Sequence, residues 1–370
     1  MNTPAPFEIF MVATPGFESA LCAEALENGF DGATVTQGGV TFTGTWPDVW
    51  RANLQMRGAT RILARVGTFM AFHLAQLDKR SRKFPWGDIL RPDIPIRVEV
   101  TCTKSKIYHA GAASQRIETA LRESFGATIA ADGPISLKVR IDDDRVTLSV
   151  DTSGESLHKR GHKEAVGKAP IRETLAALCL RQCGYSGIEP VVDPMCGSGT
   201  FIIEAAEIAA GLFPGRTRHF AFEQLATFAP AAWAAMRQST PRPTSLHFYG
   251  SDRDAGAVRM SRDNAERAGV SDLTTFENLS ASDLQPPPGP PGLVICNPPY
   301  GGRIGNPKLL FGLYASFGQT LSARFKGWRI GIITSEPPLA KAMGLPFKPK
   351  GAPIPHGGLK VWLFQTDKLR

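Results

Sequence analysis

Apolar positions recur in two different patterns along the chain, and the change between them falls near residue 160. Before that point, stretches that alternate between apolar and polar residues are interspersed with segments whose apolar residues repeat at helical spacing. Strand–helix–strand units of this size predict small α+β modules. We expect strands at 8–13, 34–35, 40–42, 94–102, 135–141 and 146–152, and helices at 18–28, 47–53 and 114–125.

After residue 160, apolar strands alternate with longer amphipathic segments. A regular alternation of strands and helices predicts a mostly parallel, doubly wound α/β sheet. The proline run at 285–291 indicates a surface loop between two such elements. We expect strands at 188–193, 245–252, 293–296, 328–335 and 359–366, and helices at 169–182, 199–210, 255–268 and 309–324.

The composition is that of a globular protein with more than one core. A chain of 370 residues is expected to form two or three domains, and 42% hydrophobic with 21% charged residues is typical of folded proteins. No apolar run approaches the roughly 18 residues of a membrane span, and no secretory signal is visible at the start. Six cysteines without CxxC spacing predict buried free thiols in a reducing cytoplasm rather than disulfides or a metal site.

Positive charge is unevenly distributed along the chain. Residues 1–78 hold four Arg against seven acids (net −3), whereas residues 79–122 hold ten Lys or Arg against four acids (net +6). Residues 159–172 hold five against one (net +4). From charge alone, such segments are equally well explained as ordinary solvated surface.

Aromatic residues within the basic segment favour a polyanionic partner over plain surface. They are Phe84, Trp86 and Tyr108. A metal-binding role for His158 and His162 is disfavoured, because no Cys or acid stands at ligand spacing. The candidate contacts to the polyanion are Arg80, Arg82, Lys83, Lys104, Lys106, Tyr108, His158, Lys159 and Arg160.

The segment 191–201, VVDPMCGSGTF, consists of a strand, an acid, a Gly-x-Gly turn and the start of a helix. Gly197 and Gly199 allow a sharp turn and a close approach of backbone N–H groups to a ligand. The third glycine of a dinucleotide fingerprint and the lysine of a phosphate loop are missing, which favours a ligand without a pyrophosphate. Alone, the pattern is also compatible with a plain tight turn. Glu204 and Glu207 follow early in the helix, where we expect a structural role.

Two further strand ends are expected at the same edge of the sheet. One strand ends at Asp252, beside the glycine turn, where a carboxylate is suited to binding the two hydroxyls of a ribose. In a sheet whose strand order reverses at this point, the strand that ends at Cys296 would lie on the other side of the turn. Asn297 would then face the same crevice as Asp252.

Asn297-Pro298-Pro299-Tyr300 follows the apolar stretch LVIC directly, and the two prolines prevent the strand from continuing. The side-chain oxygen of Asn297 and the carbonyl of Pro298 could accept the N–H groups of an exocyclic amine. They would orient its lone pair and stabilise the positive charge that develops as the nitrogen attacks a methyl carbon. Tyr300 could stack on the base. A tight turn that caps a helix is the alternative interpretation.

In combination, DPMCGSGTFIIEAA, GSDRD, NPPYGGRIG and WRIGIITS resemble the class I S-adenosylmethionine (SAM)-dependent methyltransferases, specifically the THUMP-containing RNA guanine-N2 methyltransferases of the RlmL type. The resemblance covers almost the whole chain. It implies a ferredoxin-like subdomain at 1–65, a THUMP RNA-binding domain at 66–155 and a Rossmann-like methyltransferase domain at 160–370.

The resemblance also implies the site and the partners. The catalytic, base-binding motif would be Asn297, Pro298, Pro299 and Tyr300, and the partner would be structured RNA, with 23S rRNA favoured over tRNA. No metal and no membrane are implied. The residues that would bind SAM are Thr174, Asp193, Pro194, Cys196, Gly197, Gly199, Thr200, Asp252, Arg253, Ser280, Ala281 and Asp283.

One position departs from the family pattern. In the loop that contacts the adenine, the family usually has an acid followed by Ala, whereas this chain has Ser280 before Ala281. Ser280 could accept a weaker hydrogen bond from the adenine amine, Asp283 could replace the acid, or cofactor affinity could be reduced. The sequence leaves these three possibilities open.

Several other functions share the Asn-Pro-Pro-Tyr motif. Adenine-N6 and protein glutamine-N5 methyltransferases also act on a planar, delocalised nitrogen, and the basic N-terminal segments favour RNA over both. A cytosine-C5 enzyme is disfavoured, because Cys296 precedes the motif and is better explained as a buried strand residue. An inactive RNA-binding protein is disfavoured by the intact Asp193, Asp252 and Asn297.

Overall fold

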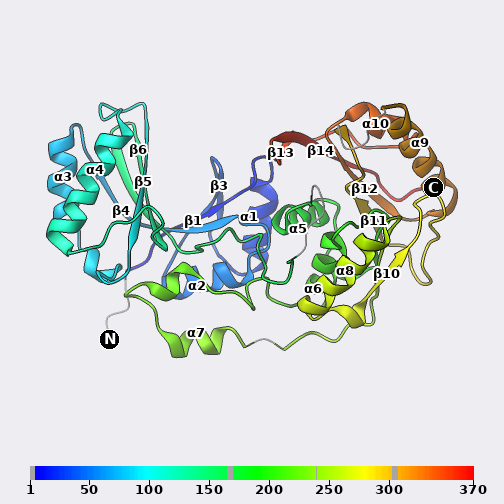
Figure 1. Cartoon of the computed structure of the whole chain (residues 1–370), viewed down its shortest axis with the longest axis horizontal. Coiled ribbons are helices and arrows are strands. Elements are labelled where there is room, and N and C mark those ends of the chain that lie inside the picture. Colours follow the sequence, from blue (N-terminus) through cyan, green and yellow to red (C-terminus); the bar gives the residue numbers. More distant parts are fainter. Residues whose placement is uncertain (1–4, 165–169, 239, 302–306) are drawn as a thin grey trace. The chain divides into compact units, whose positions relative to one another are not determined.

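The computed structural model describes residues 5–164, 170–238, 240–301 and 307–370 (Figure 1). The chain divides into two compact units. The first unit contains residues up to 13, 21–157 and 218–238, and the second contains 14–20, 158–217 and 239–370. The segment 218–238 therefore interrupts the domain that the sequence places at 160–370.

The first unit is built on a seven-stranded sheet of order β2-β3-β1-β4-β7-β6-β5, in which only β5 and β6 are parallel neighbours. β4 spans the expected domain boundary at residue 65 and pairs with β1 on one side and β7 on the other. The segments expected to form separate modules at 1–65 and 66–155 therefore share one sheet. The strands are β1 (Phe7–Val12), β2 (Thr34–Thr36), β3 (Gly39–Gly44), β4 (Arg61–Met70), β5 (Ile96–Thr103), β6 (Ile135–Asp142) and β7 (Arg145–Asp151).

The helices of this unit confirm three predictions and add two elements. α1 (Glu18–Glu27), α2 (Trp46–Gln55) and α4 (Ala110–Ala120, continued by a π-helical turn at Leu121–Phe125) were expected, although α4 begins at the His109 cap rather than at Ser114. α3 (Leu74–Arg82) and α7 (Pro230–Met236) were not expected. α3 and α4 pack against each other, and α4 also packs on β5 (Figure 1). Short 3₁₀ turns lie at Trp86–Asp88 and Ala221–Gln224.

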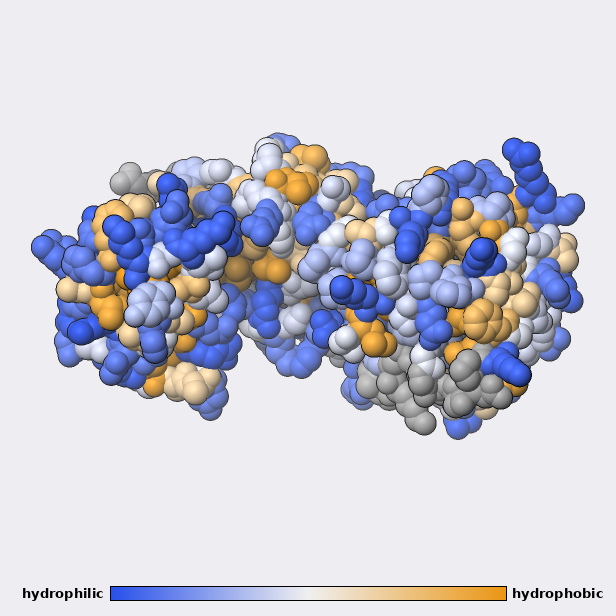
Figure 2. Space-filling view, turned by 90° about the horizontal axis from the view of Figure 1, so that it is seen from above, coloured by the Kyte–Doolittle hydropathy of each residue, from blue (hydrophilic) through white to orange (hydrophobic). Residues whose placement is uncertain are grey.

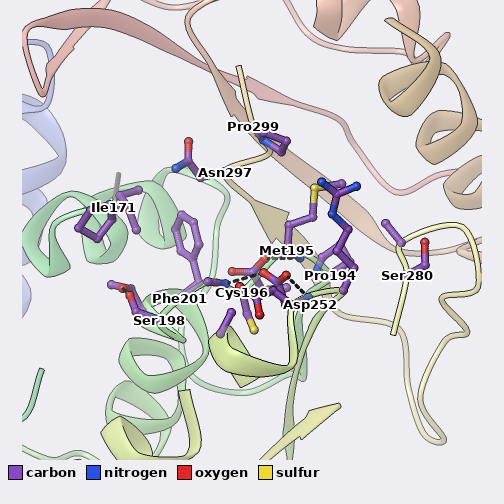
Figure 3. Close-up of a pocket in the computed structure, with 18 of the residues that line it drawn as sticks. Ile171, Pro194, Met195, Cys196, Ser198, Phe201, Asp252, Ser280, Asn297 and Pro299 are labelled. Carbon is purple, nitrogen blue, oxygen red and sulfur yellow. Dashed lines mark hydrogen bonds between the residues drawn. The ribbon is translucent and has the colours of Figure 1, made fainter. Parts of the chain in front are cut away.

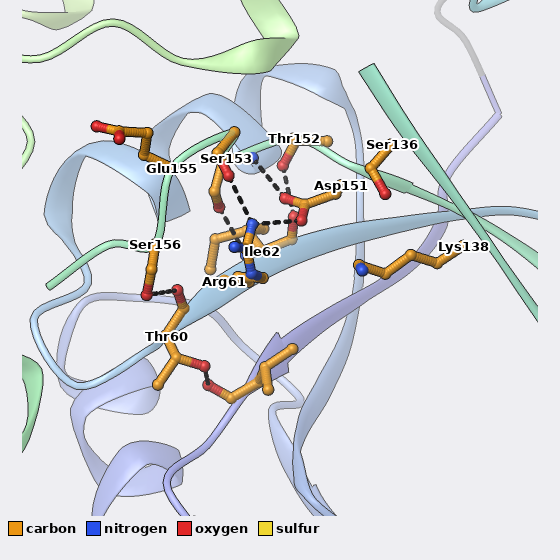
Figure 4. A network of polar contacts seen from close by, with 12 residues as sticks. Thr60, Arg61, Ile62, Ser136, Lys138, Asp151, Thr152, Ser153, Glu155 and Ser156 are labelled. Carbon is orange, nitrogen blue, oxygen red and sulfur yellow. Dashed lines mark hydrogen bonds and ion pairs between the residues drawn. The ribbon is translucent and has the colours of Figure 1, made fainter. Parts of the chain in front are cut away.

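A buried polar network joins β4 to the segment after β7 (Figure 4), and Asn53 connects α2 to it. Ser153 Oγ accepts a hydrogen bond from the Ile62 N–H at 2.8 Å and donates one to Asn53 Oδ1 at 2.6 Å. Asn53 Nδ2 in turn donates to Thr152 Oγ1, and Arg61 forms an ion pair of 2.6 Å with the buried Asp151. Because buried polar groups are costly unless paired, this network fixes the two halves of the sheet to each other.

The second unit contains the doubly wound sheet that the alternation of strands and helices predicts. Its order is β10-β9-β8-β11-β12-β14-β13, with parallel pairing from β10 to β12 and antiparallel pairing of β14 with both its neighbours. β8 lies between β9 and β11, so the strand order reverses there as expected. The strands are β8 (Val191–Asp193), β9 (Phe248–Asp252), β10 (Thr274–Asn278), β11 (Leu293–Cys296), β12 (Arg329–Thr334), β13 (Ile354–His356) and β14 (Leu359–Gln365).

The helices of the second unit form two groups. The first three contact one another in series, and the last two pack together, one of them against β12 (Figure 1). The helix expected at 169–182 begins only at Glu173, and Ala169 lies outside the described residues. The helices are α5 (Glu173–Gln182), α6 (Thr200–Ala209), α8 (Ala255–Ala268), α9 (Pro307–Arg324) and α10 (Pro337–Ala342), with a 3₁₀ turn at Ser271–Leu273.

The surface is mainly hydrophilic on the face seen in Figure 2, where hydrophobic residues form small, separate groups. Among the residues that the structure describes, no helix is both long and apolar enough to cross a membrane. Four cysteines are buried free thiols, as expected, whereas Cys22 and Cys102 are half-buried.

Candidate active site

A cavity of about 410 Å³ opens at the carboxyl ends of the parallel strands of the second unit (Figure 3). Its walls come from the segments that follow β8, β9, β10 and β11, and from the segment before α5. Ligand sites of doubly wound sheets lie at this position. The cavity is lined by Pro170, Ile171, Asp193, Pro194, Met195, Cys196, Gly197, Ser198, Thr200, Phe201, Asp252, Arg253, Asp254, Ala257, Ser280, Ala281, Asn297, Pro299 and Leu313.

The glycine turn between β8 and α6 forms one wall. Gly197 and Gly199 have φ values of +55° and +79°, in the left-handed region that favours glycine. A Cβ on Gly199 would also lie 3.1 Å from the side chain of Ser261. The Gly197 N–H donates to Asp252 Oδ2 at 3.1 Å, which ties the turn to the end of β9. The backbone conformation of both positions, and the close approach of Gly199 to its neighbours, therefore favour glycine.

Two carboxyl groups face this turn. Asp193 is only 2% exposed and accepts a hydrogen bond from the Met195 N–H at 3.1 Å. Burial raises the pKa of Asp193 well above its usual value, and the nearby Asp252 raises it further. Asp252 is half-buried and also accepts a hydrogen bond from the Asp254 N–H at 2.9 Å. Two acids in a partly apolar cavity favour a ligand that carries positive charge and hydroxyl groups.

Asn297 lies at the opposite wall, directly after β11 (Figure 3). Its Oδ1 atom is buried and has no hydrogen-bond partner among the described residues. A buried acceptor without a partner is costly, and this one belongs to a residue that lines a cavity. The arrangement is suited to accepting an N–H group from a bound molecule.

Of the residues that follow Asn297 in the Asn-Pro-Pro-Tyr motif, one lines the cavity and two do not. Pro299 lines the cavity, whereas Pro298 is buried and is not part of the lining. Tyr300 is 1% exposed and does not line the cavity either, so its expected role as an open stacking surface does not match this structure. Residues 302–305, GRIG, which complete the stretch NPPYGGRIG, lie outside the described residues.

Most of the predicted cofactor residues line the cavity. They are Asp193, Pro194, Cys196, Gly197, Thr200, Asp252, Arg253, Ser280 and Ala281. Gly199 caps α6 just behind the lining. Of the two candidates for the adenine contact, Ser280 lines the cavity, whereas Asp283 is exposed and does not. Thr174 is buried within α5 and is not part of the lining, so the structure does not bring it to the cavity.

Sequence reasoning missed one polar contact at the cavity wall. Lys163 Nζ donates to the Ile171 carbonyl at 3.0 Å and to Thr200 Oγ1 at 2.9 Å, and it also pairs with Glu173. It thereby attaches the segment before α5 to the start of α6. Because Lys163 belongs to a basic segment, its charge alone gave no signal for this buried role.

Five of the candidate polyanion contacts are exposed in the first unit. Arg80 and Lys83 lie at the end of α3, and Tyr108, with an exposed fraction of 84%, lies before α4. The structure brings three of the five together around one surface hollow. This basic hollow is lined by Cys102, Thr103, Lys104, Ser105, Lys106, Tyr108 and Asp144.

Other residues of the basic segments already have partners within the protein. Arg160 is 2% exposed and forms a buried ion pair of 3.0 Å with Glu204, so its assignment to an RNA-facing surface was wrong. Arg82 pairs with both Asp78 and Glu123. Trp86 is buried, with its indole N–H donating to the Ser81 carbonyl. A sequence shows how many charged and aromatic residues a segment contains. It does not show which of them are paired or buried in the folded protein.

The two histidines at the start of the second unit are partly or fully removed from solvent. His158 is half-buried, and burial together with neighbouring cations lowers its pKa to about 4, so it is neutral near pH 7. His162 is buried, and burial lowers its pKa as well. Lys159 is exposed. Within the described residues, no group of three or more His, Cys, Asp or Glu side chains is arranged to hold a metal ion.

Two family models match the chain. The RMKL-like methyltransferase domain matches residues 160–350, and the RlmL ferredoxin-like domain matches residues 8–63. A curated relative, the ribosomal RNA large subunit methyltransferase K/L of Syntrophotalea carbinolica, is 35% identical over 362 residues, which are 92% of this chain and 51% of the relative. The chain thus spans about half the length of the curated relatives that it matches.

Solved structures match over nearly the full chain. A protein from Listeria monocytogenes, named as a predicted N6-adenine-specific DNA methylase, is 31% identical with a TM-score of 0.85, and the match covers 98% of this chain and 96% of that one. SMU.472, named as a putative methyltransferase and solved in complex with SAH, is 30% identical with a TM-score of 0.86, and the match covers 100% of both chains. The folds of both units are therefore shared with these structures.

Proposed function

The chain belongs to the RMKL-like methyltransferase family, and on that basis we propose that it methylates an exocyclic amine of RNA with SAM as the methyl donor. The proposed substrate is large-subunit rRNA, which is supported by the names of the curated relatives and by the exposed basic hollow of the first unit. Guanine N2 is proposed as the target atom because the motifs resemble those of guanine-N2 methyltransferases. The observation that carries the proposal is the buried Oδ1 of Asn297, which has no partner within the described part of the chain and belongs to a cavity that also holds Asp193 and Asp252.

The residues of the cavity fit SAM. The cofactor carries an ammonium group, a sulfonium group and ribose hydroxyls, and the two acids are suited to these groups. Both oxygens of Asp252 already accept backbone N–H groups, which hold the carboxylate in place while leaving lone pairs for hydroxyls. The apolar side chains of Ile171, Phe201 and Leu313 provide surface for the remainder of the molecule.

Replacing the ribose acceptor should weaken cofactor binding. We expect Asp252→Ala to lower the affinity for S-adenosylhomocysteine (SAH) by about tenfold or more, because a charge-assisted hydrogen bond is removed. Calorimetric titration of the purified variant measures this directly, and Asp272→Ala, an exposed acid of the same unit, is the matched control. Unchanged SAH affinity in Asp252→Ala would reject the assignment.

The chain's own contribution to the reaction is to position a poor nucleophile. When bound, SAM supplies an electrophilic methyl group. An aromatic exocyclic amine shares its lone pair with the ring, and accepting one of its N–H groups at Asn297 Oδ1 would orient that lone pair. The same acceptor would stabilise the positive charge that develops on the nitrogen. The Pro298 carbonyl, expected as a second acceptor, lies outside the cavity lining. The product nitrogen is acidic and loses its proton readily, so the proposal requires no strong base.

Adenine N6 is the second candidate, because the Listeria monocytogenes structure bears the name of a predicted adenine-specific DNA methylase. Both amines suit the Asn297 acceptor equally well. The adenine candidate comes from a structure named as a DNA methylase, whereas the guanine candidate implies RNA. The exposed Tyr108, beside Lys104 and Lys106, is suited to stacking on unpaired RNA bases, which favours the guanine candidate.

The proposal is tested by methyl transfer from labelled SAM to RNA from a strain that lacks the gene, followed by nucleoside analysis. We expect label in N2-methylguanosine of the large-subunit rRNA fraction. Label in the tRNA fraction would change the proposed RNA but not the chemistry. N6-methyladenosine, or label only on protein glutamine, would overturn the guanine assignment.

A further inference from the structure

The backbone of the Asn297–Gly301 segment leaves the sheet without the support of a strand ladder. The pairing of β11 with β12 ends at Cys296 and Ile332. Pro298 and Pro299 carry no N–H, so the segment cannot extend the ladder. An acceptor that positions a reacting amine must nevertheless be held to within about 0.5 Å. Other groups must therefore fix this turn.

The first such group is the phenol of Tyr314 on α9. Tyr314 is 1% exposed, and its hydroxyl donates a hydrogen bond to the Pro299 carbonyl at 3.3 Å. Burial raises the pKa of Tyr314, so the phenol keeps the proton that it donates.

The second group is the carboxylate of Glu336, two residues beyond the end of β12. Its Oε1 accepts the Gly301 N–H at 2.7 Å, immediately after the motif. The backbone N–H of Glu336 donates to Thr334 Oγ1 at 3.2 Å. Gly301 has a φ of +65°, which favours glycine and turns its N–H away from a strand conformation. Glu336 is thus itself attached to the end of β12 through Thr334.

We propose that Tyr314 and Glu336 are positioning residues that hold the Asn297–Gly301 turn, one through the Pro299 carbonyl and the other through the Gly301 N–H. Neither side chain belongs to the described lining of the cavity, so each acts through the turn rather than on the substrate. This inference rests on the proposed function, because it assumes that Asn297 orients the reacting amine.

Three variants separate positioning from a merely structural role. Tyr314→Phe and Glu336→Ala each remove one hydrogen bond to the turn, and we expect kcat to fall by about tenfold while the KM for RNA and the SAH affinity stay close to wild type. Glu336→Gln keeps an oxygen that can accept the Gly301 N–H, so it should recover most of kcat. Tyr249→Phe and Glu266→Ala are the matched controls in the same unit, and they should leave kcat unchanged.

Amide hydrogen exchange of the peptide that contains residues 297–301 gives a readout that does not depend on activity. In that segment only Asn297, Tyr300 and Gly301 have exchangeable backbone amides. Glu336→Ala should speed exchange there by about tenfold, and Glu336→Gln should restore protection. These results would support the positioning role even if the natural substrate were not RNA.

The failure of this inference is distinct from the failure of the proposed function. Wild-type protein that transfers no methyl group to RNA contradicts the function and leaves the exchange result standing. Active wild-type protein, with Glu336→Ala and Tyr314→Phe retaining full kcat and normal exchange, overturns the positioning role. Equal losses in Glu336→Gln and Glu336→Ala would also overturn it, because they would show that the charge rather than the acceptor matters.

Discussion

Asp193 places a carboxyl group in the wall of the cavity, where it is almost fully removed from solvent. Burial raises its pKa, so the neutral form suits the unliganded fold and the ionised form suits a cationic ligand. The ionised Asp193 therefore lowers the stability of the free protein at high pH. We expect the protein to regain that stability when a cation binds beside the carboxylate. Conflicts of this kind, between stability and binding, are common at functional sites.

The conflict predicts a pH-dependent gain of stability in Asp193→Asn. Because the folded pKa of Asp193 is raised, the wild type loses stability as pH rises from the unfolded pKa, about 3.9, to the folded pKa, at about 1.4 kcal/mol for each pH unit. Asn does not titrate, so the unfolding free energy of Asp193→Asn minus that of wild type should grow over this window and then level off. Urea unfolding at several pH values, with Asp272→Asn as control, measures the difference. A difference that does not change with pH would contradict the raised pKa.

The position of a residue at the cavity could be predicted from the sequence where the residue stands at the end of a strand. It was harder to predict elsewhere. Asp193, Asp252 and Asn297 each stand at the end of a strand or directly after it, and the alternation of strands and helices brings such ends to one edge. Thr174 was assigned from family resemblance and Tyr300 from its place in the motif, and the structure buries both away from the cavity lining. Whether a side chain in a motif points inward or outward depends on packing that the motif does not encode.

At the level of elements, α6, which follows the glycine turn, is held by buried ion pairs. The helix carries two fully buried carboxylates, Glu204 and Glu207, and each is paired with an arginine, Arg160 and Arg216. The structural role expected for these two acids is therefore confirmed. A buried pair is strongly destabilised by the loss of one partner, because the other charge remains uncompensated.

Removing Arg160 alone should therefore destabilise the protein strongly, whereas removing Arg160 and Glu204 together should destabilise it much less. We expect Arg160→Met to lower the free energy of unfolding by about 3–5 kcal/mol, and Arg160→Met with Glu204→Leu to recover most of that loss. Urea unfolding of the two variants and the wild type tests this. If Arg160→Met unfolded like wild type but bound RNA more weakly, Arg160 would be a surface contact after all.

The sequence did not predict β4 or α3, because the repeat of apolar residues is interrupted in one and short in the other. In β4, the register shifts between Arg65 and Gly67, and this irregularity interrupts the alternation of apolar and polar residues. In α3, Leu77 is the one apolar residue that is buried, so the apolar face is too short to be recognised. By contrast, α8 was predicted with its bounds of 255–268, because it has an Asp254 cap, an apolar stripe and a terminal Gly269.

For the whole molecule, the proposed function places RNA binding in the first unit and methyl transfer in the second. The basic hollow of the first unit combines two kinds of contact that respond differently to salt. Lys104 and Lys106 would bind phosphates, which releases counterions, whereas Tyr108 would stack on a base. The two contributions can therefore be separated experimentally.

We expect Lys104→Ser with Lys106→Ser to flatten the dependence of log affinity on log salt by about 0.7–0.9 for each phosphate that is no longer neutralised. Tyr108→Ala should weaken binding by about 1–3 kcal/mol at every salt concentration without changing that slope. Fluorescence titrations of substrate RNA from low to moderate salt distinguish the two, with Lys326→Ser in the second unit as control. A double lysine variant with the wild-type slope would identify the hollow as ordinary surface.

Asn297 Oδ1 has the central role in the proposed reaction, because it orients the amine that receives the methyl group. This role is tested most directly by the single-turnover rate of methyl transfer in Asn297→Ala, at saturating SAM and RNA. We predict a fall of roughly 10²–10³, the cost of one preorganised interaction with developing charge, with SAH affinity nearly unchanged. A rate within a few-fold of wild type, or a weakening of SAH binding that explains the whole fall, would contradict this role.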